Sequence, residues 1–520
     1  MSHVEEATRS QELAWQAFRD ADLHGARGHL EAAFRHWRAA REPRHAARIA
    51  ATLADVHGTF LGNPAAGQGW VHRGRRQLEP VGRCVELGYL ELAITACELT
   101  DIERLLTAAD AALELAIEFG DPDLEVRALA DSGYGLVLHG RLTEGFARLD
   151  EAMAALSTGE LADVSLAATS YCAILTAYDR AGDAARAEEL QRIVTALPPE
   201  RRPRVLYAHC RLAYGSVLCT VGRWPEGETA MRDVLDEPGA TPGQRHDAAT
   251  RLAELRLLQG KFAEAAELLA AARSRPSAAE PLARLHLATG RPDLAVGLLR
   301  REVDAVPGDR MRTGALLGLL VEAAVVQQAL DEARAAAARL TELTALTDDQ
   351  ILRAEAALAV GRVAVAEGDP AALTYFRAAL EHLGGERPVR SAAVCLEVAQ
   401  VLADAGDTAA AVVEAQDALA VFDRVGARLC SDRAAALLRT LGTPTRAAGR
   451  SPDAVLPHLT AREREVLELL RSGLTNAEIG ARLFISAKTA EHHVGRLLAK
   501  LGVRSRAEAA AFAAAHLGRT

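Results

Sequence analysis

A glycine-marked repeat runs through most of this 520-residue chain and limits its fold more than any other feature. In each copy an apolar stretch ends in glycine, a charged residue follows, and an alanine-rich amphipathic stretch begins. The copies recur at intervals of about 40 residues. The marker positions are Gly140, Gly182, Gly222, Gly260, Gly290, Gly368 and Gly406. Gln328 stands in the widest gap as a copy without glycine. Because glycine readily adopts the left-handed conformation that ends a helix, each marker predicts a turn between two antiparallel helices.

Two helices per unit predict an all-α fold in which the units stack into an α-solenoid, since no single unit can bury its own apolar face. Aromatic residues make up only 4% of the chain and hydrophobic residues 49%, which favours closely packed helices over a β-sandwich. The repeats resemble tetratricopeptide-type helix hairpins. We predict a repeat domain over residues 1–440, a linker with prolines and glycines over 441–458, and a separate helical module over 459–520.

Three copies of one helix-start signal lie in the terminal module. Each places a hydroxyl side chain three residues before a glutamate, a pair that satisfies free backbone donors at a helix N-terminus. The pairs are Thr460 with Glu463, Thr475 with Glu478, and Ser505 with Glu508. They predict short helices over 461–472 and 476–483 and a last helix over 507–517, and Ser486 could cap another over 487–501. Such a series, with a turn at Phe484 and Ile485, is typical of a helix-turn-helix that binds DNA.

The predicted helix over 487–501, the third of the module in chain order, has two different faces. Ala490, Val494 and Leu497 would face the core, while Lys488, Glu491 and His492 lie on the opposite side. That opposite side could enter a major groove, where the three side chains can bond to base edges or phosphate. An ordinary solvated face is the alternative. The candidate DNA-binding residues are Thr475, Asn476, Ser486, Lys488, Thr489, Glu491, His492, Gly495, Arg496, Lys500, Arg504 and Arg506.

Three blocks of the module resemble the LuxR-type helix-turn-helix of bacterial transcription regulators. They span residues 459–467, 473–479 and 500–506. The resemblance implies that the third helix reads DNA, with base-reading positions at Glu491, His492 and Gly495. It also implies a homodimer, in which the fourth helix pairs two modules through Ala507, Ala510, Ala511 and Ala514. Packing of these alanines on the first helix is the alternative.

Charge and cysteine usage narrow the function further. The chain carries a net charge of −10, but residues 451–520 hold ten Lys or Arg against seven Asp or Glu, a net of +3. A mildly basic C-terminal segment in an otherwise acidic chain favours a specific DNA-binding module over a protein that coats DNA by charge. The seven cysteines show no zinc-type spacing, so we predict no metal site and no cofactor. No signal sequence or membrane span is evident, and we expect a cytoplasmic protein.

No catalytic constellation or phosphate-binding loop stands out, and we expect the protein not to be an enzyme. A group of tyrosines in neighbouring repeats, Tyr171, Tyr178, Tyr207 and Tyr214, could line a pocket for a ligand or partner, or could simply pack in the core. The leading hypothesis is a regulator that binds double-stranded promoter DNA and whose repeats sense a small molecule or a protein. The alternative is a scaffold for protein–protein interaction in which DNA binding is secondary.

Overall fold

The computed structural model describes residues 2–97, 101–158, 163–196, 204–272, 275–305, 308–385, 387–443 and 461–483, and single residues between 485 and 513. Within these residues there is no strand, and none of the helices is long and apolar enough to cross a bilayer. The chain forms two compact units, residues 1–430 and 431–520. The division falls inside α23 (Arg428–Thr440), ten residues before the predicted end of the repeats. The domain boundaries proposed from the sequence remain predictions.

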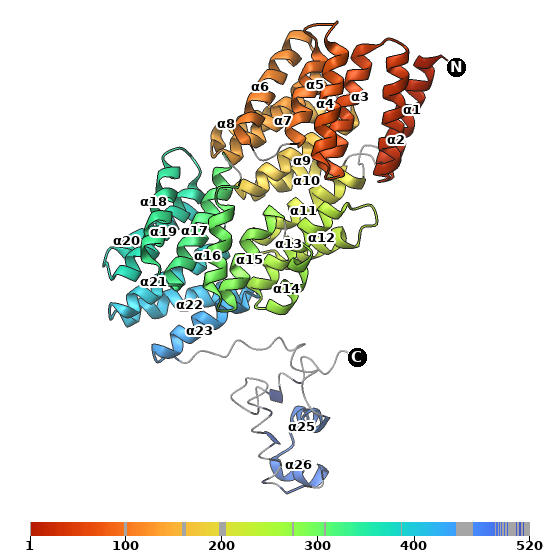
Figure 1. Cartoon of the computed structure of the whole chain (residues 1–520). Helices are drawn as coiled ribbons and strands as arrows, with labels where there is room; N and C mark the ends of the chain where they lie inside the picture. The colour runs from red at the N-terminus through yellow and green to blue at the C-terminus, as the bar shows by residue number, and fades with distance from the viewer. Residues whose placement is uncertain are drawn as a thin grey trace. The chain divides into compact units, whose positions relative to one another are not determined.

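The first unit is a stack of antiparallel helix hairpins, in agreement with the predicted α-solenoid (Figure 1). The earlier pairs are α1 (His3–Arg19) with α2 (Leu23–Ala39), α3 (Pro43–Asp55) with α4 (Pro64–Leu78), α5 (Val85–Cys97) with α6 (Ile102–Phe119), α7 (Pro122–Leu138) with α8 (Leu142–Thr158), α9 (Val164–Ala181) with α10 (Ala184–Ala196), and α11 (Arg204–Thr220) with α12 (Trp224–Asp236).

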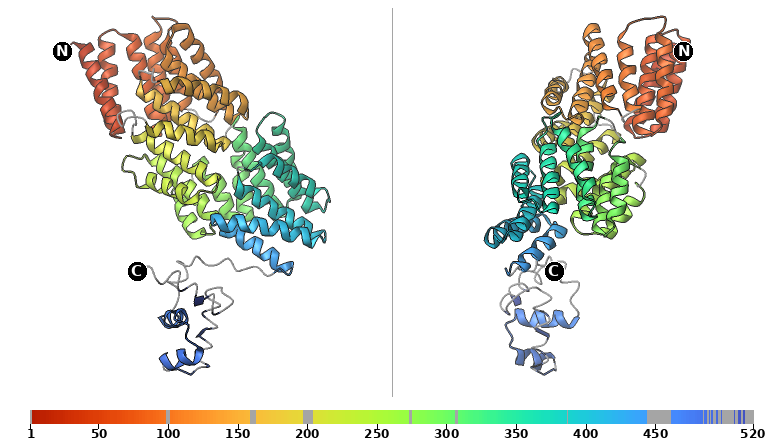
Figure 2. Two further views of the ribbon diagram at one scale, coloured as in Figure 1. Left: turned by 180° about the vertical axis from the view of Figure 1, so that it is seen from behind. Right: turned by 60° about the vertical axis from the view of Figure 1, so that its left-hand side comes forward.

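The later pairs follow the same plan (Figure 2). They are α13 (Pro242–Leu258) with α14 (Phe262–Ala270), α15 (Ala279–Ala288) with α16 (Pro292–Glu302), α17 (Arg310–Val326) with α18 (Leu330–Thr344), α19 (Gln350–Glu367) with α20 (Ala372–Leu383), and α21 (Pro388–Asp404) with α22 (Thr408–Val425). A π-helical turn, η1 (Val56–Phe60), extends α3, and a 3₁₀ turn, η3 (Pro276–Ala278), precedes α15.

The marker glycines adopt the left-handed conformation that the sequence predicts for them. All seven have a positive φ, between 69° and 88°, and each lies in the turn between the two helices of one hairpin. Gln328 occupies the same place between α17 and α18 and also has a positive φ, of 62°. The unusually short spacing between Gly260 and Gly290 coincides with two short helices, α14 and α15, of 9 and 10 residues.

The two helices of a hairpin are buried to different extents. In α17 the run from Leu316 to Val321 is buried without interruption, because this helix packs against other hairpins as well as against its partner. In α18 burial follows a single face, at Ala333, Ala336, Ala337 and Leu340. First helices of successive hairpins also contact one another, as α7 does α9 and α17 does α19. The first helices therefore form the inner layer of the solenoid and the second helices the outer layer.

The solenoid turns far enough to bring hairpins about 206 residues apart into contact. Asp348 accepts hydrogen bonds from the backbone nitrogens of Leu142 (2.6 Å) and Thr143 (2.9 Å), at the start of α8. Next along the chain, Arg387 donates to the backbone oxygen of Ala181 at 3.0 Å, across 206 residues. Counted along the hairpins, both contacts join turns that are between five and six hairpins apart, so one superhelical turn contains between five and six repeats.

Candidate functional site

The second unit contains the helix-turn-helix that the sequence predicts. α25 (Ala461–Arg471) and α26 (Asn476–Leu483) agree with the predicted first two helices to within one residue. Gly473 has a φ of 78° in the turn between them, which suits a glycine. Among the described residues that follow, Lys488, Ala490, His493, Val494 and Leu497 are helical. The backbone nitrogen of Ala490 donates to the oxygen of Ser486 at 2.9 Å, so a helical turn begins at Ser486 as predicted.

A reciprocal cap fixes the start of α26. The backbone nitrogen of Glu478 donates to Thr475 Oγ1 at 3.3 Å, and that of Thr475 donates to Glu478 Oε2 at 2.7 Å. Hydrogen bonds from the Thr475 backbone and then its hydroxyl lower the pKa of Glu478 from its ordinary value. The middle helix-start signal is thus confirmed. The other two, at Thr460 and Ser505, lie outside the described residues.

A small apolar core orients these helices. Val466, Leu470, Ile479, Val494 and Leu497 are buried together. Lys488 is exposed while Ala490 is fully buried, which is the division between faces that the sequence predicts for the third helix. Lys488 therefore lies on a solvent-facing side of the helix, where a phosphate or base could reach it.

Two arginines make contacts that sequence reasoning missed. The Arg462 guanidinium donates to the backbone oxygen of Leu483 at 2.7 Å, which ties α25 to the end of α26. Arg506, predicted to contact phosphate, donates from Nη1 to Asn476 Oδ1 at 3.2 Å. Its other terminal nitrogen, Nη2, is buried and has no hydrogen-bond partner among the described residues. No local pattern signals either contact, because the partners are 21 and 30 residues apart.

The remaining predicted contacts are described only in part. Thr475, Ser486 and Lys488 are exposed, and Asn476 is half-buried. In the fourth helix Ala509 and Ala513 face the core, and Ala510, from the predicted dimer face, is half-buried. The other predicted residues lie outside the described side chains: Thr489, Glu491, His492, Gly495, Arg496, Lys500, Arg504, Ala507, Ala511 and Ala514.

Several cavities lie among the described residues of the first unit, and two of them bear on the predicted ligand pocket. The larger, of about 690 Å³, is lined mainly by charged residues of the inner helices. Its charges are largely paired, as in the contacts of Arg251 with Asp179 at 3.1 Å and of Arg284 with Glu280 at 2.8 Å. The smaller, of about 540 Å³, lies among the first hairpins and combines aromatic and charged walls.

Of the predicted tyrosine cluster, the described side chains of Tyr171, Tyr178 and Tyr214 do not line either of these cavities. Tyr171 and Tyr178 are buried in a core cluster, and the Tyr171 hydroxyl donates to the backbone oxygen of Leu156 at 3.4 Å. Tyr214 is half-buried beside the same cluster, and the side chain of Tyr207 is outside the described set. Of the two interpretations left open, these positions favour core packing.

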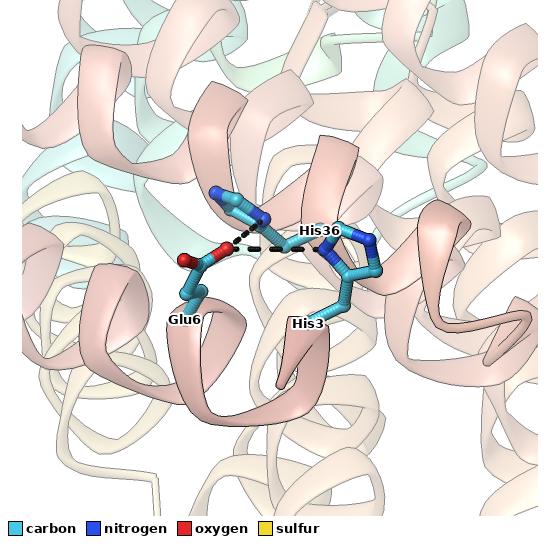
Figure 3. A group of neighbouring side chains, drawn as sticks. All are labelled: His3, Glu6 and His36. Atoms are coloured by element: carbon cyan, nitrogen blue, oxygen red, sulfur yellow. Dashed lines mark ion pairs between the residues drawn. The ribbon is translucent and has the colours of Figure 1, made fainter. Parts of the chain in front are cut away.

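Three side chains near the start of the chain could hold a metal ion (Figure 3). His3 and Glu6 come from the first turn of α1, and His36 comes from the last turn of α2. Their ligand atoms all lie within 4.8 Å of one another. The sequence gives little sign of this group, because its third member is on a different helix, 30 residues after Glu6.

Comparisons with known proteins converge on the terminal module. Residues 457–513 match the model of a family described as bacterial regulatory proteins, luxR family. Over 53 residues the chain is 51% identical to the spore germination protein GerE of Bacillus subtilis, covering 10% of this chain and 72% of GerE. Over 88 residues it is 46% identical to the DNA-binding transcriptional activator DevR/DosR of Mycobacterium tuberculosis, covering 17% of this chain and 39% of that protein.

One solved structure covers most of this chain at a low level of similarity. The APC/C hetero-tetramer Cut9–Hcn1 superposes with a TM-score of 0.40 and 12% identity, over 82% of this chain and 96% of the matched one. The confirmed cap at Thr475, the small core around Ile479 and the identity to GerE all lie in the same C-terminal segment. Through that segment, this chain belongs to the luxR family of bacterial regulatory proteins.

Proposed function

We propose that the protein is a sequence-specific transcription regulator that binds double-stranded promoter DNA through its C-terminal helix-turn-helix. The observation that carries this proposal is the pair of short helices α25 and α26, the second of them capped at Thr475, packed on a helical segment with a buried Ala490 and an exposed Lys488. The exposed position of Lys488 supports this role, because the solvent-facing side of a recognition helix is the side that enters a DNA groove. The name of the relative DevR/DosR, a DNA-binding transcriptional activator, supports the same role. A protein of this kind acts on chromosomal DNA in the cytoplasm and needs no catalytic centre.

Mapping of bound DNA across the genome tests this proposal. Crosslinked full-length protein is expected to enrich a small set of promoter fragments that share a sequence element. Twofold symmetry in that element would support the further proposal that the fourth helix pairs two modules through Ala510 and its neighbours. Uniform recovery of genomic DNA would contradict sequence-specific binding.

We further propose that the 540 Å³ cavity among the first hairpins receives a small-molecule effector. Its volume falls within the usual range of about 300–1,000 Å³ for ligand sites. Trp15, Phe18 and Phe60 supply an aromatic wall. The rings of Phe18 and Phe60 pack edge to face, with their centroids 5.3 Å apart. Asp55, Arg48 and Arg127 supply a charged wall. A molecule with an apolar body and one polar end would match both walls.

Asp55 indicates what that polar end should be. Arg127 donates to Asp131 at 2.6 Å and to Thr169 at 3.0 Å, but its nearest contact with Asp55 is 3.9 Å. Asp55 Oδ1 is buried, and none of the described groups donates to it. Burial raises the pKa of Asp55, and the nearby Arg127 offsets this only in part. A ligand with a hydrogen-bond donor, above all an amine, would compensate this carboxyl group.

The effector proposal can fail without affecting the DNA-binding proposal. Once the target operon is known, its metabolites are added to a DNA-retardation assay. We expect Asp55→Asn and Trp15→Phe to bind the operator like the parent protein but to lose the response to the active metabolite. Asp247→Asn, in the larger cavity, is the matched control and should keep the response. An unchanged response in Asp55→Asn would place the effector elsewhere, and response to a partner protein alone would favour the scaffold hypothesis.

A further inference from the structure

His3, Glu6 and His36 form a cluster whose geometry is set by the first helix hairpin rather than by chance surface contact. Ser2 caps α1: its hydroxyl accepts from the Glu5 backbone nitrogen at 3.2 Å, and the Glu5 carboxylate accepts from the Ser2 nitrogen at 2.8 Å. This cap engages Glu5 and leaves Glu6, the next residue, facing α2. His3 and Glu6 are three residues apart and therefore lie on one side of the helix.

A second contact fixes the register between the two helices at this point. The Trp37 indole donates from Nε1 to Gln11 Oε1 at 2.7 Å, next to His36 in the chain. The last turn of α2 is thereby held against the first turns of α1. His36 projects toward the same carboxylate as His3, as the side-chain view shows (Figure 3).

The distances from the Glu6 carboxylate to the two imidazoles are nearly those of donor atoms around a metal ion. Glu6 Oε2 lies 3.0 Å from His36 Nδ1 and 3.8 Å from His3 Nδ1. Around a tetrahedral ion with bonds of about 2.1 Å, adjacent donors are separated by roughly 3.4 Å. The distance from His3 Nδ1 to Glu6 Oε2 therefore has to shorten only slightly, which a rotation of the His3 side chain can achieve. That side chain is 57% exposed, so its rotation meets little resistance.

A divalent cation at the centre of the cluster would be attracted by the carboxylate and by one nitrogen lone pair of each imidazole at once. The three side chains therefore offer a complete set of ligand atoms on one side of the hairpin.

We propose that His3, Glu6 and His36 bind a divalent transition-metal ion, with zinc as the representative ion and cobalt and nickel as alternatives of the same class. Two imidazole ligands favour these ions over magnesium and calcium, which prefer oxygen ligands. The remaining coordination position is open to water. The ion joins the first turn of α1 to the last turn of α2, and α1 continues to Trp15 and Phe18 in the wall of the smaller cavity. Metal binding therefore braces that wall.

Calorimetric titration of the full chain, prepared without a histidine tag, tests the site with zinc chloride alone. One high-affinity equivalent is expected, and cobalt chloride is expected to give the visible absorption of a site with nitrogen ligands. His36→Ala and Glu6→Gln should each weaken this binding by about tenfold or more. His24→Ala is the matched control, since His24 is an exposed histidine on the same helix α2, and it should bind like the parent.

Amide hydrogen exchange gives a second readout that a nonspecific surface histidine would not affect. Zinc should slow exchange in the first turns of α1 in the parent and in His24→Ala, because a ligand that binds only the folded hairpin stabilises it. The same zinc concentration should leave exchange in His36→Ala unchanged, and magnesium should have no effect on any variant. Equal zinc affinity in the parent and His36→Ala, or no stoichiometric binding by the parent, would overturn the proposal.

Discussion

At the scale of single residues, Gln328 shows what the marker glycines contribute, because it holds a marker position without being glycine. It adopts a φ of 62° in a turn where the other marked hairpins place glycine. For a residue with a Cβ atom this left-handed conformation costs roughly 1 kcal/mol of free energy. We expect Gln328→Gly to stabilise the hairpin of α17 and α18 by up to that amount, less the entropy that glycine adds to the unfolded chain. Amide hydrogen exchange in the two helices measures the change.

The reverse substitution is the natural comparison. Gly368 has a φ of 73°, and a Cβ atom there would meet no other atom within 4 Å. Gly368→Ala should therefore lose stability through backbone strain alone, by about 1 kcal/mol. Faster exchange in Gln328→Gly, or unchanged exchange in Gly368→Ala, would show that the left-handed turns are not the strained points of the repeat.

At the scale of single elements, α26 depends on its cap. It has only 8 residues, too few to be stable without tertiary support and a satisfied N-terminus. Thr475→Ala removes the hydroxyl that accepts from Glu478 and should weaken the helix by about 1 kcal/mol, whereas Thr475→Ser keeps the hydroxyl and should change little. Hydrogen exchange at the amides of α26 provides the measurement, and equal protection in both variants would contradict the capping role.

The pH dependence of this cap has a definite sign. The folded pKa of Glu478 is lowered by its bonds to Thr475, so its contribution is fully present above the ordinary glutamate pKa. It is lost as the pH falls through the lowered value. Protection of α26 should therefore decline in acid, and Glu478→Gln should reduce it at neutral pH and flatten the acid decline. A decline that is equally steep in Glu478→Gln would point to another carboxyl group.

These elements also show how far sequence reasoning reaches. The boundaries of α25 and α26 and the turns at the marker glycines follow from capping residues and periodicity, which are local. The trio of His3, Glu6 and His36 and the bond between Arg506 and Asn476 depend on how separate helices pack, which no local pattern encodes. The proposed effector cavity is not formed by the tyrosines that the sequence singles out: Tyr171 and Tyr178 pack in the core, and the aromatic wall comes from hairpins whose repeat is irregular in sequence.

At the scale of the first compact unit, residues 1–430, the contacts between successive turns of the superhelix hold the solenoid in shape. Asp348 accepts from the first two backbone nitrogens of α8, and the Thr143 hydroxyl also donates to it. Burial acts to raise the pKa of Asp348, but these hydrogen bonds prevail and lower it. This contact is therefore present at neutral pH and is lost as the pH falls through the lowered value.

Asp348→Ala should loosen the superhelix. Removing the cap of α8 is expected to cost about 1 kcal/mol, discounted because Asp348 is largely exposed, and to increase the radius of gyration in small-angle X-ray scattering. Asp331→Ala is the matched control, because Asp331 is an exposed acid that pairs only locally with Arg334. Identical scattering from the two variants would mean that this contact does not hold the turns together.

The central claim is that this chain binds specific DNA through the exposed face of its third terminal helix. The most direct test compares operator binding, at one fixed salt concentration, by the parent, by Lys488→Ala/His492→Ala/Arg496→Ala, and by Glu465→Ala/Arg471→Ala on the exposed face of α25. With each base or phosphate contact worth about 1–3 kcal/mol, the triple variant should lose at least a hundredfold in affinity while the α25 control binds like the parent. Parent-like binding by the triple variant would contradict the claim.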